Sequence, residues 1–239
     1  MKNLVLTAGL CLLLIILGCE PEEGKVETIK GTSLTIDGKI GLAGLIALTE
    51  AHIQDIVRSM EALALSDEIK SGEWGRMKPM LRKFRDEKLY GVVLFGRPDG
   101  SYYTLERDLT DRNIRDRYYF QEAISGKVSV GDLILGKTTN KRLMVVAVPV
   151  KRDGSVIGVL GVGLHLDYLS NLLAEELEIP DNMMFYAITE DGNTAIHSDT
   201  KFLFEQPDEM RSETLSKAIN EMLSQEEGEV SYVLSLIHI

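Results

Sequence analysis

Arg117 is the side chain in this sequence with the clearest capacity to bind a small anion. It stands in the run Asp116–Gly126 and is followed at once by three aromatic residues. A guanidinium in a pocket over a sheet can hold a carboxylate through two parallel hydrogen bonds. It can equally tie its own helix to a neighbouring acid such as Asp111 or Asp116, because structural ion pairs are common. The sequence leaves both roles open.

Residues suited to catalysis or metal binding do not form a recognisable constellation. His165 and Asp167 are two positions apart at the expected end of a strand, with no further ligand nearby in sequence. The glycines of Gly158–Gly163 resemble a dinucleotide loop only loosely, because they lie inside an apolar strand and no helix opens at them. Neither a nucleophile elbow nor a phosphate loop occurs. We therefore expect no enzyme activity, no metal and no cofactor.

The overall composition excludes further classes of function. The chain has 239 residues, of which 44% are apolar, enough for one large or two small domains. There are 26 basic and 37 acidic residues, so the net charge is −11 and no nucleic-acid partner is expected. Only two cysteines occur, at Cys11 and Cys19, which excludes a disulfide scaffold.

The N-terminus resembles the signal peptide of a bacterial lipoprotein. Lys2 precedes the apolar run Leu4–Leu17, which is shorter than the about twenty residues of a membrane span. The ending Ile16–Cys19 resembles a lipobox, whose cysteine is diacylated and becomes the new N-terminus. We therefore predict a signal peptide over residues 1–18 that takes no part in the fold, and lipidation of Cys19. The protein would lie outside the cytoplasmic membrane, anchored by lipid. An ordinary signal peptide with a chance cysteine is the alternative.

An acidic tether and a long helix are expected next. Residues 19–39, which include the acidic run Glu20–Gly24, are predicted to hold the fold off the lipid surface. Apolar residues then recur at three- and four-residue steps, so we predict a long helix in the segment 40–72, ended by Gly72. A shorter helix follows over 74–84. The apolar stripes of both helices are typical of core packing, and the long helix is a candidate contact for a homodimer.

The following segments alternate apolar strands with tight turns. The turn Pro98–Gly100 separates two apolar or aromatic runs, as a hairpin turn does, and Lys151–Gly154 is a second turn of this kind. Strands are expected over 89–95, 101–105, 128–135, 143–150 and 156–166, and helices over 118–125 and 167–177. Because the strands join through tight turns, we predict an antiparallel sheet and an α+β fold.

The pattern of strand, turn and strand restarts at residue 183. A strand over 183–189, a turn over 190–193 and a strand over 194–198 repeat the hairpin around Gly100, which indicates an internal duplication. A helix over 213–223 and a strand over 229–236 would follow, but the closing hairpin of the second copy is missing. We therefore expect a second, incomplete sheet in a truncated chain, whose last residues, 235–239, are foreign.

Two runs of residues resemble the double Cache family of sensor domains. Asp116–Gly126 (DRYYFQEAISG) resembles the family pattern DRxYFxxAxxG. Ala147–Val162 resembles the family pattern aVPV…dG…iGVlGv, and Thr138–Thr139 stands between the two runs, where members carry a Thr-Thr or Thr-Gly pair. The resemblance spans roughly residues 42–223. It implies tandem PAS-like antiparallel sheets joined along a long N-terminal helix.

The resemblance also implies a domain organisation and a function. Residues 73–178 would form a membrane-distal subdomain that binds the ligand, and residues 179–239 a truncated membrane-proximal one. The chain would be an extracytoplasmic domain that senses a small molecule for signal transduction or chemotaxis, through a signalling partner. The alternative is a solute-binding lipoprotein that delivers a ligand to a transporter, although such proteins are usually built from two α/β lobes.

The family's amino-acid sensors carry the pattern RxWYxxA, which this chain matches only in part. Arg117 and Ala123 match, whereas Tyr119 and Phe120 replace the tryptophan and the tyrosine. A later tyrosine falls at Ile134, and the aspartate that holds the ligand's ammonium falls at Gly163. The resemblance thus implies a residue that binds a ligand carboxylate but none that binds a ligand amine. It favours a small organic acid over an amino acid. The other candidate pocket residues are Tyr103, Asp132 and Thr138.

Overall fold

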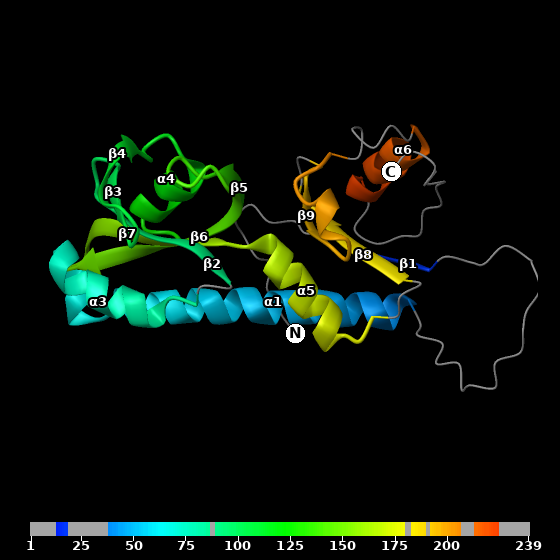
Figure 1. The fold of residues 1–239 in the computed structure, drawn as a ribbon, viewed down its shortest axis with the longest axis horizontal. Coiled ribbons are helices and arrows are strands. Elements are labelled where there is room, and N and C mark those ends of the chain that lie inside the picture. The colour runs from blue at the N-terminus through cyan, green and yellow to red at the C-terminus, as the bar shows by residue number, and fades with distance from the viewer. Residues whose placement is uncertain are drawn as a thin grey trace, which may run out of the picture. The chain divides into compact units, whose positions relative to one another are not determined.

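The computed structural model describes residues 13–18, 38–86, 89–179, 183–189, 192–206 and 213–224. The chain divides into two compact units (Figure 1). Of the described residues, the first unit contains those within 51–169, and the second contains those within 13–50 and 170–224. The predicted boundaries at residues 72/73 and 178/179 stay predictions.

The long N-terminal helix is present but shorter than predicted. Helix α1 spans Gly38–Ala64 and buries Leu45, Ile53 and Met60, among others. The predicted segment 40–72 then continues as a separate short helix, α2, over Asp67–Lys70. The two helices part because the hydroxyl of Ser66 accepts a 3.4 Å hydrogen bond from the amide of Ile69 and so caps α2.

Helix α1 is long and apolar enough to span a membrane by length and composition, from Ile40 to Ala64. Helices of soluble cores pass the same test. Residues on one face of α1 are buried in the protein, including Ile53, Ile56 and Met60. This burial agrees with the prediction that its apolar stripe packs in a core.

The first unit is built around a six-stranded antiparallel sheet in the order β4-β3-β2-β7-β6-β5. Its strands are β2 (Tyr90–Gly96), β3 (Ser101–Thr104), β4 (Asp108–Asn113), β5 (Ser129–Leu135), β6 (Arg142–Arg152) and β7 (Ser155–Leu164). Every pairing is antiparallel, as the tight turns predicted. Gly100 has φ +84°, which a hairpin turn at this point requires.

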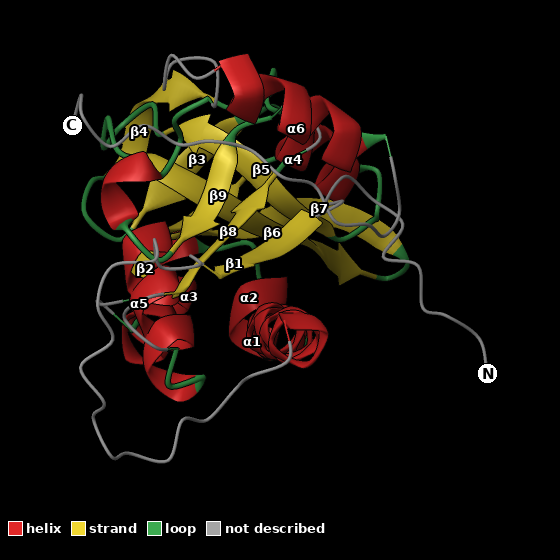
Figure 2. Cartoon of the chain, turned by 90° about the vertical axis from the view of Figure 1, so that its right-hand side faces the viewer, coloured by secondary structure: helices red, strands yellow, loops and turns green. Residues whose placement is uncertain are grey.

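Helices cover both faces of this sheet (Figure 2). Helix α4 (Tyr118–Ile124) packs against β5, β6 and β7, while α2 contacts β6 from the other face, close to α3 (Trp74–Phe84). The core between α4 and the sheet includes Tyr119, Phe120 and Ala123 of the helix, all nearly inaccessible to solvent. The sheet and α4 together position Arg117, the residue just before the helix.

Strand β4 was not predicted from the sequence. Its residues, Asp108–Asn113, are nearly all exposed and show no apolar alternation. The strand forms at the edge of the sheet through backbone pairing with β3, where Tyr103 stands opposite Leu109. An edge strand of this kind needs no apolar face, and its charges discourage pairing with other chains.

The second unit contains a three-stranded sheet in the order β1-β8-β9. Its elements are β1 (Leu13–Gly18), β8 (Met183–Ile188), β9 (Thr194–His197), the 3₁₀ turn Thr200–Phe202 and α6 (Glu213–Leu223). Helix α5 (Leu166–Glu176) begins in the first unit and continues in the second. The predicted strand over 229–236 lies outside the described residues.

Strand β1 belongs to the segment that we predicted to take no part in the fold. It pairs antiparallel with β8, from Leu13 opposite Ile188 to Gly18 opposite Met183. By pairing with β8, the short apolar strand β1 satisfies backbone N–H and C=O groups that would otherwise be unpaired at the edge of the sheet. Cys19 lies outside the described residues, so the lipobox and the signal peptide stay predictions. Cleavage before Cys19 would remove β1 from the mature chain.

Candidate functional site

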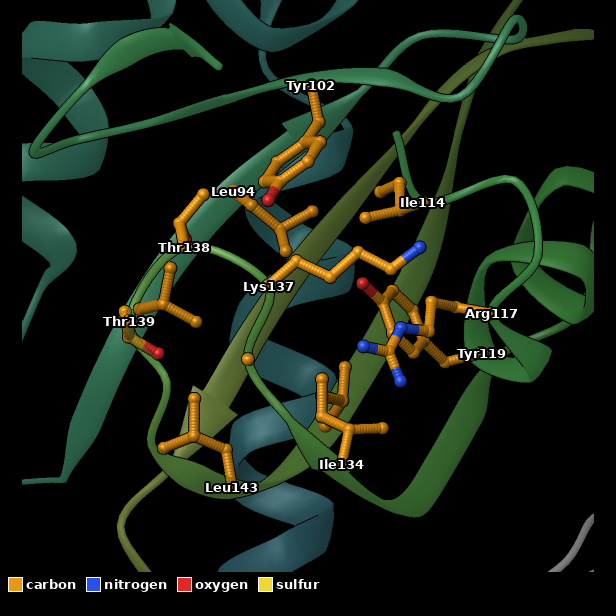
Figure 3. A pocket seen from close by; sticks show the side chains of 13 residues that line it. Leu94, Tyr102, Ile114, Arg117, Tyr119, Ile134, Lys137, Thr138, Thr139 and Leu143 are labelled. Atoms are coloured by element: carbon orange, nitrogen blue, oxygen red, sulfur yellow. The ribbon is translucent and has the colours of Figure 1, made fainter. Parts of the chain in front are cut away.

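A small cavity lies in the first unit between the sheet, the start of α4 and the turn after β5 (Figure 3). Its volume of about 20 Å³ has room for roughly one water molecule. Its wall is apolar on the sheet side and polar at the turn. The lining residues are Val92, Leu94, Tyr102, Ile114, Arg117, Tyr119, Ile134, Gly136, Lys137, Thr138, Thr139, Leu143 and Val145.

Arg117 lines this cavity with an incompletely satisfied guanidinium. Its Nη2 donates a 2.9 Å hydrogen bond to the carbonyl oxygen of Leu135 at the end of β5. Its Nε is buried and has no hydrogen-bond partner within the described residues. Such a buried donor destabilises the protein until an acceptor reaches it. A ligand carboxylate that reached this atom would supply that acceptor.

The alternative role of Arg117, an ion pair with a neighbouring acid, is not seen in the described part of the chain. Asp116 pairs with Lys137, and Asp111 lies 3.9 Å from Arg112. Arg117 forms no ion pair there and ties α4 to β5 through the Leu135 carbonyl instead. Its charge is therefore not neutralised by a contacting carboxylate.

Lys137 is the second cation on the cavity wall. It lies in the turn after β5, with about a quarter of its side chain exposed. Its Nζ donates a 2.7 Å hydrogen bond to the carbonyl oxygen of Asn113 and pairs with the carboxylate of Asp116. The hydrogen bond from Lys137 holds the pKa of Asp116 below its ordinary value. In Figure 3 the Lys137 side chain extends from its turn toward Ile114 and Arg117.

Position 163 carries no charge and has no space for a side chain. A Cβ atom built on Gly163 would lie 2.8 Å from Cδ1 of Leu143 and 2.8 Å from Cγ1 of Val92, both residues of the cavity wall. No side chain fits there unless those neighbours move. The position at which the resembled family carries its amine-binding aspartate is thus filled by apolar side chains.

The structure brings together some of the predicted site residues. Arg117, Tyr119 and Thr138 line the cavity. Phe120 lies in the core beneath α4 and is 1% exposed. Asp132 lies on β5, opposite Val145 of β6, and nothing is described of its side chain.

Tyr103 lies away from the cavity. Its ring stacks on Trp74 with centroids 5.0 Å apart, and its hydroxyl accepts a hydrogen bond from Arg97. The neighbouring Tyr102 lines the cavity instead. Successive side chains of a strand point to opposite faces of the sheet, so only one of the two tyrosines can reach the pocket.

Sequence reasoning missed several of the lining residues. Tyr102 was not among the predicted site residues; its neighbour Tyr103, which points to the opposite face of the strand, was predicted instead. Lys137 was not among the predicted site residues either. Ile114 carries no sequence signal of binding, and Thr139 stood out only as part of the Thr138–Thr139 pair of the resembled family. The two residues come to the cavity through the path of the chain before α4 and through the turn after β5.

Other chemistry in the described residues is sparse. No group of three or more His, Cys, Asp and Glu side chains that could hold a metal occurs within the ranges given above. Burial lowers the pKa of His165 and lowers that of His197 to about 4, so both imidazoles are neutral in the folded protein at pH 7.

No protein-family model matches the chain. The ligand-binding domain of the Pseudomonas fluorescens chemoreceptor CtaA is similar to it: in the complex with L-serine it is 18% identical, with a TM-score of 0.56 over 72% of this chain and 74% of that one. The same domain with L-valine is 17% identical and gives a TM-score of 0.56, over 72% and 77% of the two chains.

A third similar structure comes from another chemoreceptor. The ligand-binding domain of the amino acid chemoreceptor PctC of Pseudomonas aeruginosa PAO1, in complex with GABA, is 16% identical. Its TM-score is 0.53 over 72% of this chain and 78% of that one. The chain therefore has the fold of chemoreceptor ligand-binding domains, and the predicted α+β architecture with a long N-terminal helix and two antiparallel sheets is confirmed.

Proposed function

We propose that this protein is an extracytoplasmic sensory domain that binds a small organic acid in the cavity at Arg117. The fold shared with chemoreceptor ligand-binding domains supports a role in sensing for chemotaxis or another signalling output. The observation that carries the ligand assignment is the buried, unpartnered Nε of Arg117 on the cavity wall. A carboxylate oxygen is the natural acceptor for it.

The residues of the cavity wall also disfavour an amino acid as the ligand. The similar structures hold GABA, L-serine and L-valine, each of which carries an amine. None of the residues that line this cavity is acidic in the described part of the chain, and position 163 has no room for a carboxylate. An ammonium group buried here without an acceptor would cost several kcal/mol, roughly the binding free energy of a millimolar ligand.

A thermal-shift screen tests the assignment. The purified protein should be stabilised by one or more small organic acids and by none of the common L-amino acids. Arg117→Ala should abolish the response. Lys127→Ala is the matched control, because Lys127 is exposed and pairs with Glu122 away from the cavity. Stabilisation by an amino acid, or an undiminished acid response in Arg117→Ala, would contradict the proposal.

The lipid anchor is a further part of the proposal, supported by the lipobox at Ile16–Cys19 alone. In a Gram-negative host supplied with labelled fatty acid, the protein should become labelled. Cys19→Ser should remove the label, whereas Cys11→Ser should keep it, because Cys11 leaves with the signal peptide. Label that persists in Cys19→Ser would refute the anchor and leave the ligand site untouched.

A further inference from the structure

Two cations from different elements of the first unit reach the same cavity wall. Arg117 comes from the start of α4, and Lys137 comes from the turn Gly136–Lys141 that joins β5 to β6. None of the 13 residues that line the cavity, all of them in the described part of the chain, carries a negative charge. The wall therefore has an excess of two positive charges facing a space of about 20 Å³.

The acid that neutralises Lys137 stands outside this wall. Asp116 is not a lining residue, and 68% of its side chain is exposed. A partly exposed ion pair of this kind is weak, because water reaches the exposed carboxylate and screens its charge. Lys137 can therefore exchange Asp116 for another anion at little cost. Arg117, in contrast, has no carboxylate partner among the described residues and donates there to the Leu135 carbonyl.

The Asp116–Lys137 pair also connects the two segments that border the cavity. Asp116 immediately precedes Arg117, and Lys137 is followed by Thr138 and Thr139, which line the cavity as well. A second bond, from Lys137 to the carbonyl oxygen of Asn113, closes the turn over the same segment. The cavity of about 20 Å³ holds roughly one water molecule, so a larger ligand requires the turn or another part of the wall to move.

We propose, resting on the organic-acid function proposed above, that the ligand is a short dicarboxylate. One carboxylate binds Arg117, including its Nε. The other replaces Asp116 as the ion-pair partner of Lys137. A monocarboxylate would satisfy only one of the two cations and would leave the Asp116–Lys137 pair in place. Exchange of that pair links ligand binding to movement of the turn Gly136–Lys141. The hydroxyls of Thr138 and Thr139 can donate to the second carboxylate.

Probes that differ only at one end of the molecule test this inference. Calorimetric titration compares dicarboxylates of three to five carbons with monocarboxylates of the same chain length and with 4-aminobutanoate. At least one dicarboxylate should bind about tenfold to a hundredfold more tightly than its matched monocarboxylate, the usual effect of one hydrogen-bonded charge. 4-Aminobutanoate should bind more weakly than either. Methyl phosphate, a dianion with a single anionic group, should not replace the dicarboxylate.

Two variants with opposite expected effects keep the test independent of folding defects. Lys137→Met should reduce dicarboxylate affinity far more than monocarboxylate affinity, so that the difference between the two disappears. Asp116→Asn frees Lys137 and should raise dicarboxylate affinity by about twofold to fivefold, the range of an exposed ion pair. Lys127→Met, which removes one charge away from the cavity, should change neither.

The outcomes distinguish failure of the dicarboxylate inference from failure of the organic-acid function on which it rests. Binding of monocarboxylates and dicarboxylates with equal affinity, through Arg117, would overturn the dicarboxylate inference and keep the organic-acid site. Unchanged dicarboxylate affinity in Lys137→Met would also overturn it. Binding of methyl phosphate in preference to every dicarboxylate would assign the two cations to one phosphate group. Binding of every acid in Arg117→Ala as in the parent protein would overturn the site itself.

Discussion

The carbonyl oxygen of Leu135, the last residue of β5, accepts a 2.9 Å hydrogen bond from Nη2 of Arg117, the residue immediately before α4. This bond uses one N–H group of the guanidinium and leaves Nε buried without a partner among the described residues. Arg117 therefore has both a structural contact and a free donor. The two contribute to stability with opposite signs.

We predict that Arg117→Ala changes the free energy of unfolding of the ligand-free protein by no more than about 1 kcal/mol. The lost bond to Leu135 destabilises the protein, while removal of the unsatisfied Nε offsets that loss. Urea denaturation followed by circular dichroism measures the change. A loss of about 3 kcal/mol or more would show that Arg117 is mainly a structural residue.

A substitution at Gly163 should destabilise the first unit. The Cβ of Gly163→Ala would stand 2.8 Å from both Leu143 and Val92, so the core must shift, which costs about 1–3 kcal/mol. Gly75→Ala is the matched control, because nothing lies within 4 Å of its Cβ and the residue is inside α3. That substitution should stabilise the protein by about 0.5–1 kcal/mol. Equal melting temperatures for the two variants would contradict the close packing at Gly163.

Much of the sheet could be predicted from local sequence, whereas β4 could not. The apolar strands and the turn at Gly100 have signals within a few residues of each other. Strand β4 has none, because its pairing comes from β3 and not from its own side chains. The end of α1 was missed for a similar reason. Apolar spacing continues to Ile69, and only the hydroxyl of Ser66 decides that a new helix starts.

The site was predictable in its central residue and not in its wall. Arg117 stands out by type and by the resemblance around it, and it lines the cavity. The period of a strand shows that Tyr102 and Tyr103 face opposite sides, but not which side meets α4. Lys137 depends on the folded path of the turn after β5, which brings it to Asn113 and Asp116. No local pattern contains that information.

The buried His197 should make the second unit less stable in mild acid. Burial lowers the pKa of His197 to about 4, and its Nδ1 accepts a 2.8 Å hydrogen bond from the amide of Asp199. An unfolded histidine has a pKa of about 6.5. Between these values the unfolded state binds the extra proton, so stability falls as the pH falls from about 6.5 to about 4, by up to about 3 kcal/mol.

Urea denaturation at a series of pH values measures this dependence. His197→Asn keeps an acceptor for the Asp199 amide and removes the titration, so it should flatten the curve over that range. His165, whose pKa burial also lowers, would contribute the slope that remains. A pH dependence that is identical in the parent protein and in His197→Asn would show that the pKa of His197 does not differ between the folded and unfolded states.

Substitutions of the neighbouring residues Tyr102 and Tyr103 test on which face of β3 the ligand binds. Tyr102 is 3% exposed and lines the cavity, whereas Tyr103 stacks on Trp74 away from the lining residues. Tyr102→Leu should weaken the organic-acid response in a thermal-shift titration, because it changes the shape of the wall. Tyr103→Leu should leave the midpoint of that titration unchanged and lower the free energy of unfolding by about 0.5–1.5 kcal/mol through loss of the ring stack. A ligand response that depends on Tyr103 and not on Tyr102 would move the site to the other face of β3.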